Sequence, residues 1–200
     1  EIGSAVKGYE GITAGEADFS AVEEMIRASG ASAVYFGGMY PEGALLIKQL
    51  KEKGIDVVFL GPDGMDSAEL IKIAGDAVIG NYYTSVAADV SGTEAGAAFV
   101  KKFTETYGRA PEAFAAYGYD AMNVTLDGIK AAIEAAGTLP TREQVATAIR
   151  ATKDFKGLAT NVTFNEIGDN TEATIFVLGF EQAAYPPISI KSIPASEYLK

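Results

Sequence analysis

The order of apolar runs along the first half of the chain most constrains its fold. Short runs rich in β-branched and aromatic residues alternate with amphipathic runs of helical length. We expect strands at residues 6–12, 31–36, 56–60 and 78–86, and helices at 17–29, 40–53, 66 or 67 to 73, and 91–107. Apolar strands separated by such helices are typical of a parallel sheet covered on both faces. The sequence therefore predicts a doubly wound α/β fold.

Helical spacing also predicts which side chains face inward. The expected apolar stripes are Val22, Met25 and Ile26 in the first helix, Leu46, Ile47 and Leu50 in the second, and Phe99, Val100 and Phe103 in the fourth.

The alternation stops after Gly108, and a proline-marked connection follows. A long helix at 117–136 comes next without a parallel strand behind it. Thr141 and Gln144 have the spacing of a capping box for a helix ending near residue 152. We then expect an antiparallel hairpin of 162–164 with 174–180, turning at 165–170, and an extended, proline-rich tail at 185–200.

Composition excludes several classes of function. The chain has 200 residues with 27 acidic and 16 basic side chains, a net charge of −11, and no cysteine or histidine. These counts exclude histidine-based triads, cysteine nucleophiles and thiolate zinc sites, and an acidic surface without a basic cluster argues against nucleic acid. We expect no metal and no cofactor. No apolar run approaches the roughly 20 residues of a membrane-spanning helix, so we expect a soluble chain whose export signal, if any, has been removed or lies outside it.

Two glycine-rich turns follow the second and third expected strands, where a doubly wound sheet binds its ligands. The first turn begins at Gly37 and Gly38 and continues into Met39 and Tyr40, and the second is Gly61-Pro62-Asp63-Gly64. Glycines let the backbone approach a ligand, and the Asp63 carboxylate is placed to bind a cation such as a substrate ammonium. The alternative is that Pro-Asp-Gly is only a favoured β-turn.

Other motifs give weaker evidence for a binding site. Tyr82, Tyr83 and Phe114 either line an apolar pocket or belong to the core. The glycines of residues 37–43 form neither a P-loop nor a dinucleotide fingerprint, and Asp63, Asp66 and Glu69 lack the spacing of a calcium loop.

Four segments, in this order, resemble the leucine/isoleucine/valine-binding proteins, which are type I periplasmic binding proteins of ABC importers. The segments are YEGITAGEADFS (9–20), VYFGGMYPE (34–42), GPDG (61–64) and IAGDAVIG (73–80). The resemblance implies that Asp63 binds the ligand's α-ammonium and that Met39, followed by Tyr40, stands where the family has an aromatic residue packed on the ligand. It places the family's crossover aromatic at about Phe114. The expected ligand-binding residues are Asp63, Met39, Tyr40, Gly38, Gly64, Tyr83 and Phe114.

The resemblance also divides the chain. Residues 1–108 correspond to the second ligand-binding lobe, incomplete at its start; 109–170 to the segment returning to the partner lobe; and 171–200 to the final crossovers and tail. Most of the amino-terminal lobe has no counterpart, so either the chain is a fragment or the partner lobe is supplied separately. We then expect an exposed apolar stripe, Met122, Leu126, Ile129 and Ile133, where the helix at 117–136 would meet that lobe.

The function implied is that of a non-catalytic substrate-binding component of an ABC importer, periplasmic or anchored at the cell surface. Its partners would be a branched-chain or other small aliphatic amino acid and the membrane permease. Two alternatives stay open: a sensing or receptor module of the same fold, and an α/β enzyme with Asp63 as base. The enzyme is disfavoured because the chain offers no histidine and no convincing second carboxylate beside Asp63.

Overall fold

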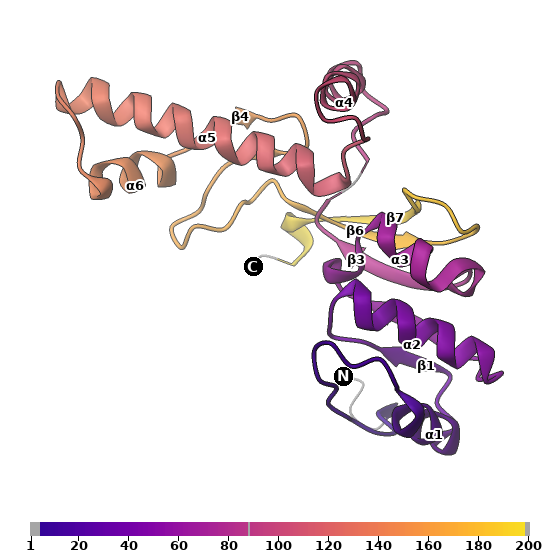
Figure 1. The fold of residues 1–200 in the computed structure, drawn as a ribbon. Coiled ribbons are helices and arrows are strands. Elements are labelled where there is room, and N and C mark those ends of the chain that lie inside the picture. The colour runs from indigo at the N-terminus through magenta and orange to yellow at the C-terminus, as the bar shows by residue number, and fades with distance from the viewer. Residues whose placement is uncertain (1–4, 88, 199–200) are drawn as a thin grey trace. The chain divides into compact units, whose positions relative to one another are not determined.

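The computed structural model describes residues 5–87 and 89–198, which form two compact units. The first contains the chain up to Ser85 together with Val177–Lys191, and the second contains Val86–Phe176 and the residues from Ser192 onward (Figure 1). The chain passes between the units after Ser85, after Phe176 and after Lys191.

The first unit is built on parallel strands. β1 (Ala33–Tyr35), β2 (Val58–Gly61) and β3 (Tyr82–Ser85) pair in parallel, with Val34 opposite Phe59 and Leu60 opposite Tyr82. β6 (Thr174–Gly179) and β7 (Ile188–Pro194) complete a sheet of order β1-β2-β3-β6-β7. The predicted α/β fold with a parallel sheet is confirmed.

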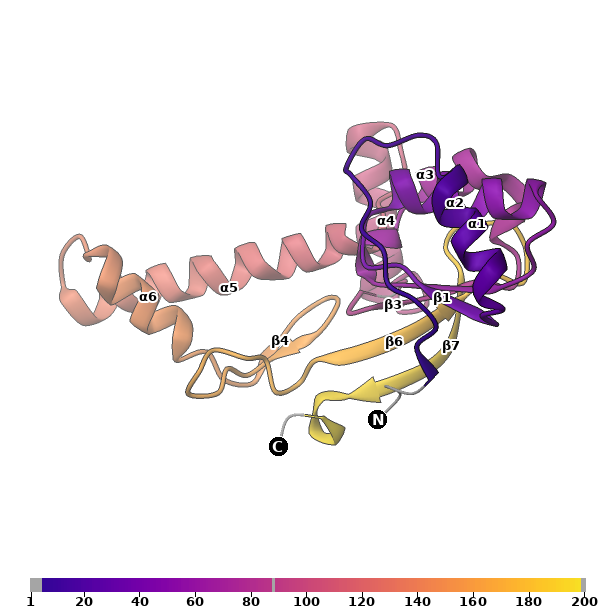
Figure 2. The same cartoon turned by 90° about the horizontal axis from the view of Figure 1, so that it is seen from below.

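Helices alternate with these strands and end where the sequence predicts. α1 (Ser20–Ser29) stops at Gly30, whose φ of 62° lies in the left-handed region, and Pro41 occupies the first turn of α2 (Tyr40–Glu52). The Ser67 side chain caps α3 (Ala68–Ala74) by accepting the Glu69 N–H. Figure 2 shows α2 and α3 side by side on one side of the sheet.

The core of this unit confirms one predicted stripe and corrects another. Leu46, Ile47 and Leu50 are buried, and so are Phe36 and Phe59, whose ring centroids lie 5.5 Å apart. On α1, Val22 and Ile26 are half-buried, but Met25 is exposed and the fully buried side chain is Glu23. Glu23 forms an ion pair with Lys53. Apolar spacing could not predict this face, because the inward residue is charged and its partner lies 30 positions away.

Two predicted strands differ from the structure. Residues 6–12 form no strand, and within the described residues no strand pairs with them; an extended segment needs a neighbour for its backbone hydrogen bonds. The strand predicted at 78–86 is shorter, because the 3-10 turn η3 (Gly75–Val78) and Gly80, with φ of 85°, precede β3. The Asn81 side chain links β2 to η3, because it accepts the Phe59 N–H and donates to the Ala77 carbonyl.

The second unit contains α4 (Glu94–Tyr107), α5 (Ala113–Ala136) and α6 (Arg142–Arg150). α5 begins four residues before the predicted start. Both hydrogen bonds of the capping box between Thr141 and Gln144 are present. The inward face of α4 is half-buried at Phe99, Val100 and Phe103. Figures 1 and 2 show α6 folded back beside the carboxyl-terminal part of α5.

The predicted hairpin of 162–164 with 174–180 is wrong. β5 (Asn161–Val162) pairs antiparallel with β4 (Phe155–Lys156), and β6 joins the large sheet. Buried Asp120 of α5 holds the β4–β5 connection by accepting the N–H groups of Leu158 and Ala159, both at 2.7 Å. Phe164 instead forms an isolated antiparallel bridge with Asn170, a residue of the predicted turn.

The tail is extended over β7, as predicted, and then forms the 3-10 turn η4 (Ala195–Glu197); residues 199–200 lie outside the described part of the chain. Among the described residues, no helix has the length and apolarity needed to cross a bilayer.

Candidate functional site

The turns after β1 and β2 lie against each other in the first unit. Parallel pairing brings the carboxyl ends of both strands to one edge of the sheet. A Cβ placed on Gly64 would lie 2.6 Å from the Gly38 carbonyl oxygen and 2.7 Å from the Met39 sulfur. The structure thus brings together Gly38, Met39 and Gly64, three of the predicted site residues.

Two further glycines make room for a buried side chain beneath this contact. A Cβ on Gly43 or on Gly61 would lie 2.5 Å from side-chain atoms of Met65, which is 2 % exposed. Met65 belongs to the 3-10 turn η2 (Asp63–Met65) that follows β2. The glycines around the turns therefore serve close packing as well as access to the edge of the sheet.

The first turn leads directly into α2. Met39 occupies the N-cap position in extended conformation, and its side chain is 58 % exposed, while Tyr40 is half-buried. Glu42, in the first turn of α2, accepts the Gly15 N–H at 2.7 Å, and this hydrogen bond lowers the pKa of the Glu42 carboxyl group. Residues 11–16 (GITAGE) thus lie beside the start of α2.

Asp63 opens η2 and is exposed. Within the described part of the chain, no hydrogen bond or ion pair engages its carboxylate. The Asp63 backbone is held, because its carbonyl accepts the Asp66 N–H at 2.9 Å. An exposed carboxylate on a fixed turn is suited to bind a cationic group, and its role as the ammonium-binding residue stays a prediction.

Asp66, the residue that follows η2, is not among the predicted ligand-binding residues. Oδ1 accepts hydrogen bonds from the hydroxyls of Tyr83 and Tyr185, and Oδ2 accepts one from Ser85, all at 3.0 Å. Burial raises the pKa of the Asp66 carboxyl group; the three hydroxyls act in the opposite direction, and the Asp63 charge adds to the rise. These donors lie 17, 19 and 119 residues away in sequence, so no local motif could reveal them.

Tyr83 lies in the core of the first unit. Its side chain is 3 % exposed, its ring centroid is 5.8 Å from that of Phe180, and its hydroxyl reaches Asp66. Its predicted contact with a ligand is untested, and its observed contact is with the turn that carries Asp63.

Phe114 belongs to the second unit, in the first turn of α5, and it is partly exposed. Its ring centroid lies 6.3 Å from that of Tyr117, whose hydroxyl donates to the Val86 carbonyl. Burial and, to a smaller extent, the charge of Asp120 raise the pKa of Tyr117 to about 12. The ligand role of Phe114 also stays a prediction.

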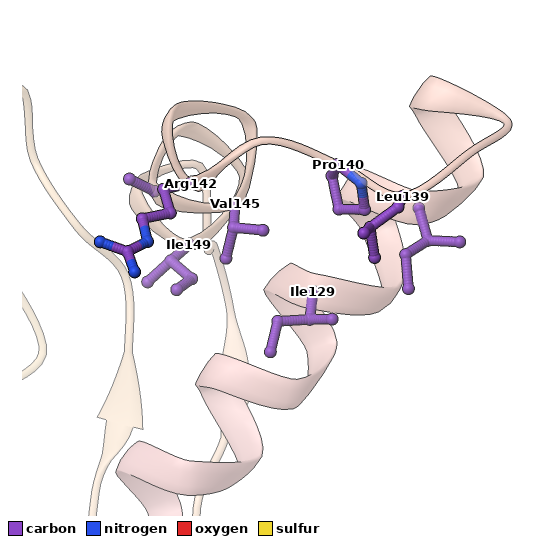
Figure 3. A pocket seen from close by; sticks show the side chains of 8 residues that line it. Ile129, Leu139, Pro140, Arg142, Val145 and Ile149 are labelled. Carbon is purple, nitrogen blue, oxygen red and sulfur yellow. The ribbon is translucent and has the colours of Figure 1, made fainter.

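A separate apolar pocket lies between α5 and α6 (Figure 3). It has a volume of about 360 Å³, and its one charged lining residue is Arg142. The other lining residues are Ile129, Ile133, Leu139, Pro140, Val145, Ala146 and Ile149. The pocket has no carboxylate and contains none of the predicted site residues.

Among the described residues, no three acidic side chains gather in a way that could hold a metal ion. The turns after β1 and β2 carry the exposed carboxylate of Asp63, the exposed thioether of Met39 and the half-buried ring of Tyr40. Groups of these kinds suit the cationic and apolar parts of small molecules, and a ligand-binding role for this set stays a prediction.

Comparisons with known proteins find relatives in sequence and in fold. The chain is 37% identical over 169 residues to the Leu/Ile/Val-binding protein homolog 1 of Brucella abortus, covering 84% of this chain and 44% of the relative. It is 35% identical over 181 residues to the leucine-, isoleucine-, valine-, threonine- and alanine-binding protein of Pseudomonas aeruginosa, covering 88% of this chain and 46% of that protein. The crystal structure of a leucine-binding protein of Thermotoga maritima matches with a TM-score of 0.77 and 33% identity, over 93% of this chain and 51% of that one.

The chain thus spans about half the length of the curated relatives it matches. Residues 1–181 match the family described as periplasmic binding protein. This chain therefore belongs to the periplasmic binding protein family.

Proposed function

We propose that the chain forms one lobe of a substrate-binding protein of an ABC importer that binds a branched-chain or other small aliphatic amino acid between two lobes. The observation that carries the proposal is the exposed Asp63 carboxylate, held on a turn packed against Gly38 and Met39. The relatives named above for leucine, isoleucine and valine support the same ligand class.

Each part of a zwitterionic aliphatic amino acid has a proposed counterpart. The Asp63 carboxylate binds the α-ammonium, and Met39 and Tyr40 contact the aliphatic side chain. The partner lobe, which the chain does not include, supplies the donors for the α-carboxylate. Binding of this kind changes no covalent bond, so leucine incubated with the protein should be recovered unchanged.

The decisive experiment replaces Asp63 in a two-lobed protein that contains this chain. Asp63→Asn keeps the shape of the side chain and removes its charge, so leucine binding should weaken by about 2 to 5 kcal/mol, the range for breaking a buried charge pair. Isothermal titration calorimetry measures the loss.

Asp76→Asn is the matched control, because Asp76 is also an exposed acid in a 3-10 turn, η3. Its leucine affinity should equal that of the unmodified protein. Full affinity in the Asp63→Asn protein would contradict the proposed site and leave Asp63 as a turn residue.

The transport partner and the compartment are part of the same proposal. Delivery to an ABC permease requires the protein outside the cytoplasmic membrane, in the periplasm or anchored at the cell surface. Deleting the gene should abolish high-affinity leucine uptake by whole cells and leave the permease intact.

A further inference from the structure

We infer that Asp66 is a positioning residue: the three hydroxyl groups bound to its carboxylate fix the turn that presents Asp63. The inference rests on the proposed function, since it concerns the orientation of the group proposed to bind the ammonium.

Asp66 is joined to Asp63 through the backbone. It follows η2 directly, and its N–H donates to the Asp63 carbonyl at 2.9 Å. A displacement of Asp66 is therefore transmitted to Asp63 across a single hydrogen-bonded turn.

Through its side chain, Asp66 is hydrogen-bonded to residues in two other parts of the first unit. Tyr83 and Ser85 lie on β3, and Tyr185 lies in the connection between β6 and β7. Ser85 is also the last residue before the chain leaves this unit. The carboxylate thus ties the turn to β3 and to a connection distant in sequence.

The chemistry of the residue supports a role beyond local turn formation. All three partners are neutral hydroxyls, and the exposed carboxylate of Asp63 lies near enough to repel the Asp66 charge. A turn alone would be served by asparagine or serine without this repulsion. An ionised carboxylate, in contrast, accepts from several hydroxyls at once on two oxygens.

The first test uses the 200-residue chain and needs no ligand. Tyr185→Phe removes one hydroxyl and keeps the ring, so the backbone amide NMR resonances of Asp63, Gly64 and Met65 should shift. Tyr35→Phe is the matched control, because Tyr35 is 70 % exposed on β1 and takes no part in the Asp66 cluster. Unchanged resonances in the Tyr185→Phe chain would overturn the inference.

The second test is a double-mutant cycle for leucine affinity in the two-lobed protein that the proposed function requires. Tyr185→Phe should weaken leucine binding about threefold to tenfold, the equivalent of one hydrogen bond. In the Asp63→Asn background the same substitution should change affinity less than about twofold, because its effect acts through Asp63. Asp66→Asn, which keeps one acceptor oxygen, should lose less affinity than Asp66→Ala.

Different results would contradict the inference and the proposed function. Equal losses with and without the Asp63 carboxylate would show a merely structural role and overturn the inference while the proposed function stands. Failure of the unmodified two-lobed protein to bind any amino acid would contradict the proposed function, and the NMR comparison would still decide whether the hydroxyls hold the turn.

Discussion

At the scale of single residues, the contact between the two turns depends on the absence of a side chain at Gly64. The nearest atom to a Cβ at this position is the backbone oxygen of Gly38, which cannot rotate away as a side chain could. The turn carrying Asp63 therefore keeps its place only with glycine at position 64.

Gly64→Ala should destabilise the chain by about 1 to 3 kcal/mol, the usual cost of overpacking, because one turn must move away from the other. Gly37→Ala is the control: no atom lies within 4 Å of a Cβ there, and its φ is not in the left-handed region. Urea denaturation followed by circular dichroism measures both. Equal stability of the two variants would show that the turns do not depend on this contact.

Residue-level prediction from sequence succeeded where the signal is local. The Pro-Asp-Gly sequence was enough to place Asp63 on a turn at the end of a strand, and the structure has it there. It could not reveal the hydroxyl partners of Asp66 or the ion pair of Glu23 with Lys53, because those contacts exist only after helices and strands from distant segments have packed.

At the scale of elements, periodicity and end signals predicted α2, α3 and α6 within about two residues. The same signals predicted strands less well, since a strand needs a partner that its own sequence does not encode. Residues 6–12 have a strand pattern but no pairing strand in the described chain, and 174–179 pair in the large sheet where a hairpin was expected.

The capping box of α6 gives the clearest element-scale prediction. Thr141→Ala removes the acceptor of the Gln144 N–H and should cost about 1 kcal/mol, with faster amide exchange at the start of α6. Thr138→Ala serves as control, because Thr138 is exposed in the preceding loop. Hydrogen exchange monitored by mass spectrometry compares the two, and equal protection of α6 would contradict the role of the cap.

At the scale of the whole molecule, α5 presents an apolar face to solvent within its unit. Met122, Leu126 and Ile133 are 58 %, 53 % and 44 % exposed, as predicted, whereas Ile129 is half-buried; Ile129 and Ile133 both line the pocket beside α6. Apolar side chains gathered on one helix face are costly to leave in water. Together with the half-length match to the relatives, this face favours our prediction that a further lobe covers it.

A chain with only one lobe should bind leucine weakly or not at all. In the proposed site, Asp63, Met39 and Tyr40 would contact one side of the ligand, and the opposite side would stay hydrated because no second lobe closes over it. The isolated chain should show no thermal shift with millimolar leucine, and Asp63→Asn should make no difference to that result. The two-lobed protein, in contrast, should gain about 2.7 kcal/mol at a leucine concentration 100 times its dissociation constant. Micromolar binding by the isolated 200 residues, measured by calorimetry, would show that this lobe alone forms a complete site.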